Sequence, residues 1–252
     1  MKIQFASDLH LEFIFNKAYM EKNPLLAVGD ILILAGDIVP FNMMHAADNF
    51  FDYVSDNFQM TYWIPGNHEY YHSDINKRSG SFQEQIRDNI FLLNNKSIQI
   101  EGYRIIFSTL WTSIGGQHAN EIKRGMADFT VIKDDGLSLR PQKSNKLHEE
   151  CLIFIQKELK ECKEDEKSIV VTHHVPTTIN YPSKYRGSIL NEAFAVELKN
   201  FIKELKPNYW IYGHHHTNKK DFQIGETQLM TNQLGYIDLQ EQAGFNPARL
   251  IF

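Results

Sequence analysis

Short apolar runs that do not alternate with polar residues constrain the fold of this chain most strongly. Stretches such as ILILA at 31–35 and SIVVT at 168–172 present apolar side chains to both faces of a strand. A strand with two apolar faces must be covered on both sides, as in a layered α/β fold. Six such runs occur, at 3–6, 31–35, 61–64, 103–110, 168–172 and 209–212.

Helical patterns separate these runs. Apolar residues repeat at helical spacing from Phe194 to Leu205, which predicts an amphipathic helix that ends before Pro207, and a second helix is predicted from Leu147 to Leu159. Gly225-Glu226 lies between two short β-rich runs and predicts an antiparallel hairpin, so the sheets should mix parallel and antiparallel strands.

Nothing between these elements resembles a linker or an internal repeat, so we expect one domain over 1–252. Two long connections, at 112–128 and 177–189, are predicted to be irregular, and loops of that length often serve a site.

Composition limits the classes of binding partner that we expect and indicates the cellular compartment. Twenty-six basic and thirty-one acidic residues give a net charge of −5, which disfavours a broad basic surface for nucleic acid but leaves a local patch open. No apolar run is long enough for a bilayer, and the first ten residues lack a signal-peptide core. Cys151 and Cys162 are expected in one helix, too far apart for a disulfide. We therefore expect no membrane association and a cytoplasmic location.

Polar residues with metal-ligand chemistry follow five of the six runs. They are Asp8 and His10, Asp37, Asn67 with His68 and Glu69, His173 with His174, and the run from His214 to His216. The carboxyl ends of parallel strands meet at the edge where open α/β sheets bind ligands. Aspartate, histidine and asparagine suit Mn, Fe or Zn, and the absence of cysteine ligands argues against a structural zinc site.

Spacing supports a common centre. Residues two apart in an extended chain share a face, so Asp8 and His10 should reach one ion, as should His214 and His216 with His215 turned aside. Gly36, Gly66 and Gly213 precede the candidate ligands and permit a close approach of the backbone. Each motif alone is common in polar turns; their joint order indicates a site.

The order Asp-x-His, Gly-Asp, Gly-Asn-His-Glu, His, Gly-His-x-His, from Asp8 to His216, resembles the calcineurin-like metallophosphoesterase superfamily, in its small bacterial-type branch. The resemblance implies a four-layer α-β-β-α sandwich of two mixed sheets, with a dinuclear metal site at the carboxyl ends of the strands. It also implies a two-metal phosphoesterase that cleaves a phosphomonoester or phosphodiester by attack of metal-bound hydroxide.

The resemblance further implies roles for eight residues. Asp8, His10 and His216 would hold the first ion, Asp37 would bridge both, Asn67, His173 and His214 would hold the second, and His68 would be the general acid. His174 would support the centre or pack locally. The ions would be divalent transition metals, and a near-neutral pKa suits His68 to protonating the leaving oxygen.

One departure from the pattern concerns the partner of His68. The protein-phosphatase branch has an orienting aspartate and then Arg-Gly where this chain has Pro40 and Phe41. Either another carboxylate, with Glu69 as a candidate, or the backbone must hold His68. The missing Arg-Gly argues against a phosphoprotein phosphatase and favours a small-molecule or nucleotide phosphoester as substrate.

Substrate contacts are predicted in the loop after His173. Lys184 or Arg186 could bind phosphate and Tyr185 could stack on a base or sugar, although an ordinary solvated loop explains them equally well. Tyr70 and Tyr71 could wall the cleft, but core or rim packing is favoured.

Two other functions stay open. A nuclease or cyclic nucleotide phosphodiesterase would need a basic track in the cleft. A non-catalytic scaffold on the same fold is disfavoured, because such proteins tend to lose ligand positions and every position is present here.

Overall fold

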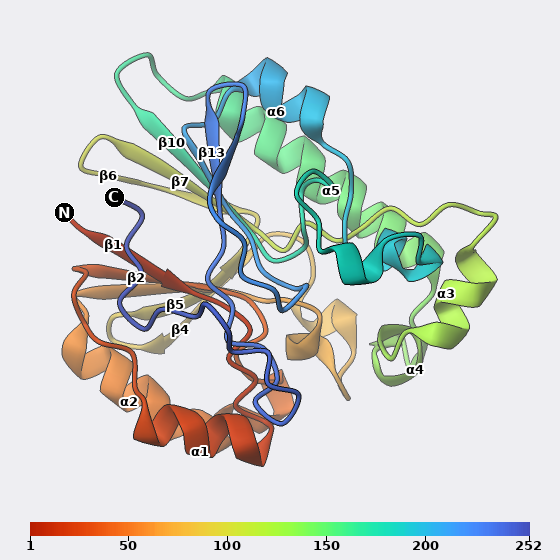
Figure 1. Cartoon of the computed structure of the whole chain (residues 1–252), viewed down its shortest axis with the longest axis horizontal. Coiled ribbons are helices and arrows are strands. Elements are labelled where there is room, and N and C mark those ends of the chain that lie inside the picture. The colour runs from red at the N-terminus through yellow and green to blue at the C-terminus, as the bar shows by residue number, and fades with distance from the viewer.

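Two β-sheets lie face to face in the computed structural model, which describes residues 1–252 (Figure 1). The first sheet has the order β1-β2-β3-β5-β4 and the second the order β12-β13-β11-β10-β7-β6. The first comprises β1 (Ile3–Ala6), β2 (Ile31–Ala35), β3 (Met60–Ile64), β4 (Phe82–Arg87) and β5 (Ile90–Asn94). The second comprises β6 (Lys96–Ile100), β7 (Tyr103–Ser108), β10 (Lys167–Thr172), β11 (Tyr209–Ile211), β12 (Phe222–Ile224) and β13 (Thr227–Met230).

Helices cover the outer faces of both sheets. Helices α1 (Ile14–Lys22) and α2 (Asp48–Asn57) lie beneath the first sheet, and α5 (Pro141–Lys160) and α6 (Lys199–Leu205) lie against the second (Figure 1). The excursion between β7 and α5 carries α3 (Ala119–Gly125), α4 (Asp128–Val131) and the ribbon of β8 (Lys133–Asp134) and β9 (Leu137–Ser138). The predicted four-layer sandwich is confirmed.

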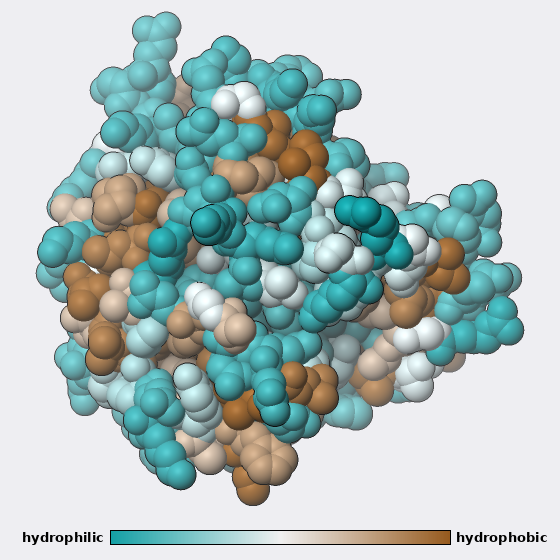
Figure 2. All heavy atoms as spheres, in the orientation of Figure 1, coloured by the Kyte–Doolittle hydropathy of each residue, from teal (hydrophilic) through white to brown (hydrophobic).

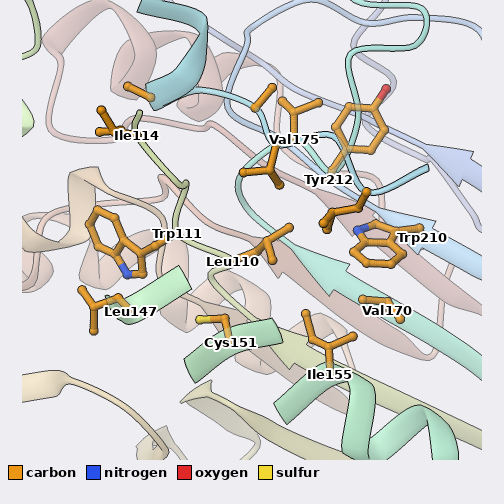
Figure 3. Close-up of a cluster of buried hydrophobic side chains, with 14 of the residues drawn as sticks. Leu110, Trp111, Ile114, Leu147, Cys151, Ile155, Val170, Val175, Trp210 and Tyr212 are labelled. Carbon is orange, nitrogen blue, oxygen red and sulfur yellow. The ribbon is translucent and has the colours of Figure 1, made fainter. Parts of the chain in front are cut away.

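Three apolar clusters explain why the strand sequences do not alternate. In β2, Ile31 and Ile33 pack between the sheets, while Leu32 and Leu34 pack outward under α1 and α2. In β10, Val170 faces outward into the cluster that includes Cys151 and Ile155 of α5 (Figure 3). Every face of these central strands is buried, so apolar residues occupy consecutive positions.

Parallel pairing at the centre of each sheet places the carboxyl ends of its strands at the same edge. Strands β1, β2, β3 and β5 are mutually parallel, as are β7, β10, β11 and β13, whereas β4, β6 and β12 pair antiparallel at the edges. The predicted hairpin at Gly225 is the β12–β13 pair, with a left-handed φ of 62° at Gly225.

The predicted helix from 194 to 205 is too long. Only α6 is α-helical; a 3₁₀ turn, Ile189–Ala193, precedes it, and the chain at 194–196 pairs with Val175 instead. Val175 N donates to Phe194 O and Val196 N to Val175 O, at 3.1 and 3.0 Å. These bonds tie the segment to Val175 and divert it from a continuous helix, so tertiary pairing overrides its helical pattern.

Three smaller predictions also need correction. Cys162 lies beyond α5, which ends at Lys160, although both cysteines are free as expected. The connection at 112–128 is not wholly irregular, because it contains α3. The strand expected at 103–110 ends at Ser108. None of the helices combines the length and apolar character needed to cross a bilayer.

Candidate metal centre

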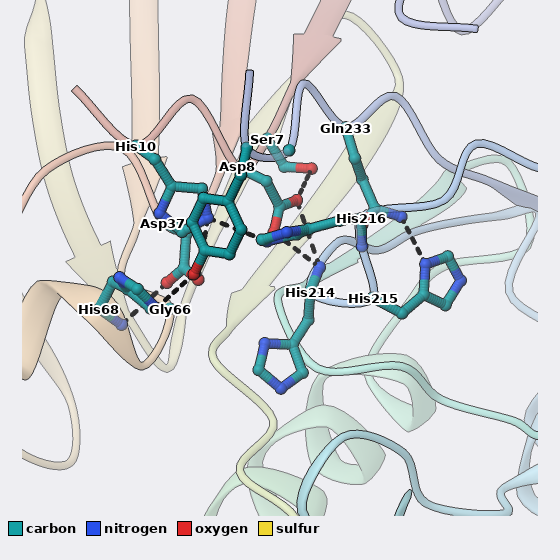
Figure 4. Close-up of polar contacts among 12 residues, drawn as sticks. Ser7, Asp8, His10, Asp37, Gly66, His68, His214, His215, His216 and Gln233 are labelled. Atoms are coloured by element: carbon teal, nitrogen blue, oxygen red, sulfur yellow. Dashed lines mark hydrogen bonds and ion pairs between the residues drawn. The ribbon is translucent and has the colours of Figure 1, made fainter. Parts of the chain in front are cut away.

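The loops that leave β1, β2, β3, β10 and β11 converge at the carboxyl ends of the strands (Figure 4). One group there contains Asp8, His10, Asp37 and His216, and a second contains Asp37, His173 and His214; within each, the potential ligand atoms lie within 4.8 Å of one another. Asn67 joins the second group, with its Oδ1 3.2 Å from His173 Nε2. The structure thus brings all seven predicted ligands together.

The backbone reaches this arrangement through left-handed residues. Five of the seven have positive φ: Asp8 (56°), His10 (48°), Asp37 (54°), His214 (80°) and His216 (46°). Non-glycine residues rarely adopt this region, and surrounding contacts must hold them there. Contrary to the prediction, Asp8 and His10 therefore do not share a face of an extended chain; left-handed turns bring them together.

Glycine permits the close packing around these turns, as predicted. A Cβ on Gly66 would lie 2.2 Å from Asp37 Oδ1, and one on Gly36 would lie 2.4 Å from His173 Nδ1. Both distances are far inside contact distance, so any larger residue would displace a candidate ligand.

Hydrogen bonds fix which nitrogen each ring presents in the first group. His10 Nδ1 lies 3.2 Å from Glu12 Oε1, and His216 Nδ1 lies 2.6 Å from Glu241 Oε2. A carboxylate only accepts, so each ring donates from Nδ1 and presents Nε2. The two Nε2 atoms face each other at 2.9 Å. Two acceptors at that distance require a shared cation, either a proton or a metal ion.

In the second group, too, hydrogen bonds determine which atom of each side chain faces inward. His173 Nδ1 donates to Ala35 O at 3.0 Å, so its Nε2 faces inward toward His214 Nδ1 at 3.0 Å. Asn67 Nδ2 donates to Asp128 Oδ1 at 2.9 Å, which aims the amide oxygen at the site. The inward set of imidazole nitrogens and amide and carboxylate oxygens suits a divalent transition metal.

Asp37 lies between the two groups. Its Oδ2 is 3.3 Å from His173 Nε2 and 3.8 Å from His10 Nε2, while Oδ1 accepts from the backbone N of His68 at 2.9 Å. Burial alone would lower the pKa of His173, but the carboxylates of Asp37, Asp8 and Glu69 together outweigh it and raise that pKa to about 9. In the metal-free protein a proton thus occupies the place of a cation, and metal binding must displace it.

Glu69 does not hold His68. Its carboxylate accepts from the backbone N of Asp37 (2.9 Å), Ile38 (2.7 Å) and Gly66 (2.6 Å) and from the indole of Trp63 (3.1 Å). It therefore ties together the loops after β2 and β3. Glu12 contacts His68 instead, with Oε1 2.9 Å from Nδ1. Two imidazoles on this carboxylate outweigh its burial and lower the pKa of Glu12 to about 2.

The sequence argument missed Glu12, Glu241 and Tyr236. Tyr236 Oη lies 3.2 Å from His68 Nε2, and its ring packs against those of His10 and His216. Glu12 carried a signal, since it follows His10 at the same spacing that separates His10 from Asp8. Tyr236 and Glu241 carried none, because they come from a C-terminal segment with no motif of its own.

The remaining candidates divide between rim and core. Lys184 Nζ lies 3.9 Å from Glu241 Oε1 and 4.7 Å over the Tyr185 ring, at the edge of the first group. Arg186 is exposed and makes no side-chain hydrogen bond. Tyr71 stacks on His68 with ring centroids 4.0 Å apart, whereas Tyr70 is buried in the core.

Two neighbouring histidines have local partners. His174 Nδ1 donates to Thr109 O at 3.1 Å, and its ring packs against Trp111. His215 points away from the ligand groups and contacts Gln233, as expected (Figure 4).

The model of the calcineurin-like phosphoesterase family matches residues 1–218, which include every candidate ligand. The chain belongs to this family. This calcineurin-like phosphoesterase is therefore a metal-dependent phosphoric ester hydrolase, and its ligand groups form a dinuclear site for divalent metal ions.

This calcineurin-like phosphoesterase is similar to one protein in sequence and to several solved structures in fold. An uncharacterized protein of Acanthamoeba polyphaga mimivirus is 32% identical over an alignment of 275 positions that covers 97% of this chain and 94% of the viral protein.

Solved structures share the fold at 13% identity. The phosphopantetheinyl hydrolase PptH of Mycobacterium tuberculosis matches with a TM-score of 0.73 over 100% of this chain and 95% of that one. A purple acid phosphatase from yellow lupin (Lupinus luteus) matches with a TM-score of 0.50 over 92% of this chain and 43% of the lupin chain.

Proposed function

We propose that this calcineurin-like phosphoesterase hydrolyses a small phosphomonoester or phosphodiester with two divalent transition-metal ions. The observation that carries the proposal is the pair of inward-facing ligand groups that share Asp37 Oδ2. Asp8, His10 and His216 hold the first ion, Asn67, His173 and His214 the second, and Asp37 both. Mn, Fe or Zn would suit these ligands, and a bound pair would supply Lewis acidity to activate water and neutralise phosphoryl oxygens.

His68 is the general acid in this proposal. Its Nδ1 is held by Glu12, and its Nε2 lies 3.2 Å from Tyr236 Oη. From there Nε2 can deliver a proton to the leaving oxygen, which is the usual work of a positioned imidazole.

The surface beside His68 favours a leaving group with an apolar or aromatic face. Phe13 is 42% exposed and its ring centroid lies 6.4 Å from that of His68. Ile14 and Phe15, at the start of α1, are more exposed still. Figure 2 shows apolar residues among the polar ones at the lower edge of the molecule, where Figure 1 places α1. Lys184, Tyr185 and Arg186 are the proposed substrate contacts in the loop beside Glu241.

Two further features support proposals about the cellular compartment and the domain organisation. Both cysteines are free thiols, which supports a reducing compartment such as the cytoplasm. Gln4 of β1 pairs with Leu250 near the end of the chain, which supports one domain over 1–252.

The test is reconstitution of the metal-free protein with Mn, Fe, Co, Ni, Zn and Mg in turn. Each form is assayed on alkyl and aryl monoesters, diesters, cyclic nucleotides and a phosphopantetheinyl ester, the last because the mycobacterial neighbour is named for that group. We expect hydrolysis that saturates at two equivalents of a transition metal. Failure of every metal on every ester would contradict the proposal.

A further inference from the structure

A carboxylate from an unexpected segment lies beside the proposed acid. Glu12 lies in the turn between β1 and α1, and its side chain is 8% exposed. Its Oε1 is 2.9 Å from His68 Nδ1 and 3.2 Å from His10 Nδ1. Pro40, where a related branch has an aspartate, has no side-chain acceptor. The acid would otherwise have no carboxylate partner.

We propose that Glu12 is the positioning residue of His68, and that the same oxygen joins the acid to the first metal position through His10. The carboxylate accepts the Nδ1 proton and thereby turns Nε2 toward the leaving group. This inference rests on the proposed role of His68.

His68 has two polar ring contacts: Tyr236 Oη, near Nε2, can donate or accept, so only the Glu12 carboxylate, near Nδ1, fixes which nitrogen donates. Tyr71 stacks on one face and the edge of the ring meets His10, with centroids 4.0 and 4.5 Å away. These contacts restrict the plane of the ring, but they do not distinguish Nδ1 from Nε2. A hydrogen bond to Nδ1 makes that distinction.

The turn that carries Glu12 is itself well held. Leu11 N donates to Ile38 O at 2.8 Å, and Phe13 N donates to His10 O at 3.1 Å. The first of these bonds ties the turn to the loop after β2, which also carries Asp37. Glu12 therefore stands on backbone fixed to the ligand loops, as a positioning residue requires.

One oxygen of Glu12 carries both of its contacts. Oε1 is 2.9 Å from His68 Nδ1 and 3.2 Å from His10 Nδ1, whereas Oε2 is buried and makes no hydrogen bond. Replacement of Glu12 by alanine would leave two buried imidazole N–H groups without an acceptor, so the free energy of unfolding should fall. The acid function is therefore read from the difference between two esters on folded protein, which a loss of stability alone does not change.

The experiment compares Glu12→Ala, Glu12→Gln and the matched control Glu21→Ala, an exposed glutamate on α1. Each is assayed at saturating metal on an alkyl ester and a p-nitrophenyl ester. For Glu12→Ala we expect kcat to fall about 10- to 100-fold on the alkyl ester, the usual effect of losing a supporting carboxylate, and to change little on the p-nitrophenyl ester. Glu12→Gln should recover most of the alkyl rate, since its amide oxygen still accepts.

Two additional readouts make the result specific. In the His68→Ala background, Glu12→Ala should cause no further loss of alkyl selectivity. Imidazole ¹⁵N spectra of the metal-free protein should show the hydrogen-bonded Nδ1 proton of His68 disappear in Glu12→Ala and persist in Glu21→Ala.

Several outcomes would overturn the inference. Equal slowing of both esters by Glu12→Ala would assign Glu12 to His10 and metal binding alone. Selectivity losses that add to those of His68→Ala, or an unchanged His68 spectrum, would separate Glu12 from the acid. Wild-type protein that hydrolyses no ester would contradict the proposed function and this role with it, whereas wild-type hydrolysis with any of the other failures would contradict only the role of Glu12.

Discussion

Neighbouring imidazoles of the metal centre have two different proposed roles, donating a proton and binding a metal ion. His68 and His173 both lie close to Asp37, one through its backbone N and one through its ring. Only the ring of His173 faces the carboxylate. This difference separates an acid from a ligand and can be tested directly.

His68→Ala is expected to keep both metal ions. Loss of a general acid should slow an alkyl ester by about a hundredfold to ten-thousandfold, but slow p-nitrophenyl phosphate little, because that anion departs without a proton. Metal analysis and steady-state kinetics on both esters give the readout. His173→Ala is the control and should lose the second ion and slow both esters alike. If His68→Ala sheds an ion, His68 belongs with the ligands.

Asp37→Asn is expected to weaken both metal positions at once, because Asp37 Oδ2 lies within 3.8 Å of a ligand nitrogen in each group. Titration of the metal-free protein, followed by metal analysis, should show reduced affinity at both positions. Asp165→Asn, at an exposed aspartate, should bind like the parent. Loss of a single ion would argue that Asp37 serves one position only.

At the scale of elements, the loop around the 3₁₀ turn Ser183–Tyr185 lies at the rim beside Glu241. Lys184→Ala should lower kcat/KM about tenfold, the effect of one charged hydrogen bond to substrate, with metal content unchanged. Arg186→Ala should have a smaller effect, because Arg186 is exposed and makes no side-chain hydrogen bond. Parental kinetics in both variants across the ester panel would leave this loop without a substrate role.

Helix α5 carries a buried histidine that should make stability depend on pH. His148 Nδ1 donates to Trp111 O, and burial lowers the pKa of His148 below its usual value. The unfolded chain therefore gains a proton at about pH 6.5 that the folded protein does not gain until a lower pH. This contribution to the free energy of unfolding is present above that pH and is lost as the pH falls toward the folded-state pKa.

Urea unfolding of the metal-free protein at pH 7.5 and pH 5 tests this prediction. His148→Gln, which can still donate to Trp111 O, should lose less stability on acidification than the parent. His45→Gln, at an exposed position, should behave as the parent does. The same pH dependence in all three proteins would contradict the prediction.

At the scale of the whole molecule, the segment after β13 returns to the first sheet and brings Tyr236 and Glu241 to the centre. Buried Asn16 of α1 holds it there, donating to Leu9 O at 2.9 Å and Gly235 O at 2.8 Å and accepting from Ile237 N at 3.1 Å. One side chain thus joins the loop after β1, helix α1 and the C-terminal segment.

Asn16→Ala would leave these three backbone groups without their partner. We expect the free energy of unfolding to fall by about 1–3 kcal/mol and hydrolysis to weaken as Tyr236 and Glu241 lose their support. Denaturant unfolding and kinetics provide the measurement, with Asn23→Ala as the control, because exposed Asn23 bonds only within its own helix end. An unchanged unfolding midpoint would show that packing alone holds the segment.

The sequence predicted the parts of the fold that local pattern determines. Central strands such as β2 and β10 were predictable because both their faces are buried. Strands β4, β5 and β6 were missed. In the edge strands β4 and β6, one solvent-facing side mixes polar residues such as Gln83 and Gln99 into the pattern, whereas β5 was overlooked although its run IFLLN is apolar. The helical pattern at 194–198 failed because pairing with Val175 is a long-range contact.

The metal centre, too, has parts that local pattern predicts and parts that long-range contacts determine. The candidate ligands follow predicted strands and could be found by motif, although left-handed turns rather than alternation bring them together. Glu241 and Tyr236 could not be predicted, because their contacts depend on how a distant segment crosses from one sheet to the other.

That crossing has a consequence for synthesis on the ribosome. The outer edge of β1 is paired by the end of the chain: Phe5 N donates to Arg249 O, Ser7 N to Asn232 O, and Ile251 N to Ile3 O. Because β1 is translated long before Asn232, Arg249 and Ile251, this edge stays unpaired until those residues have emerged. Unpaired apolar edges recruit other chains, so a nascent chain stalled before residue 232 would lack a functional centre and be prone to aggregation.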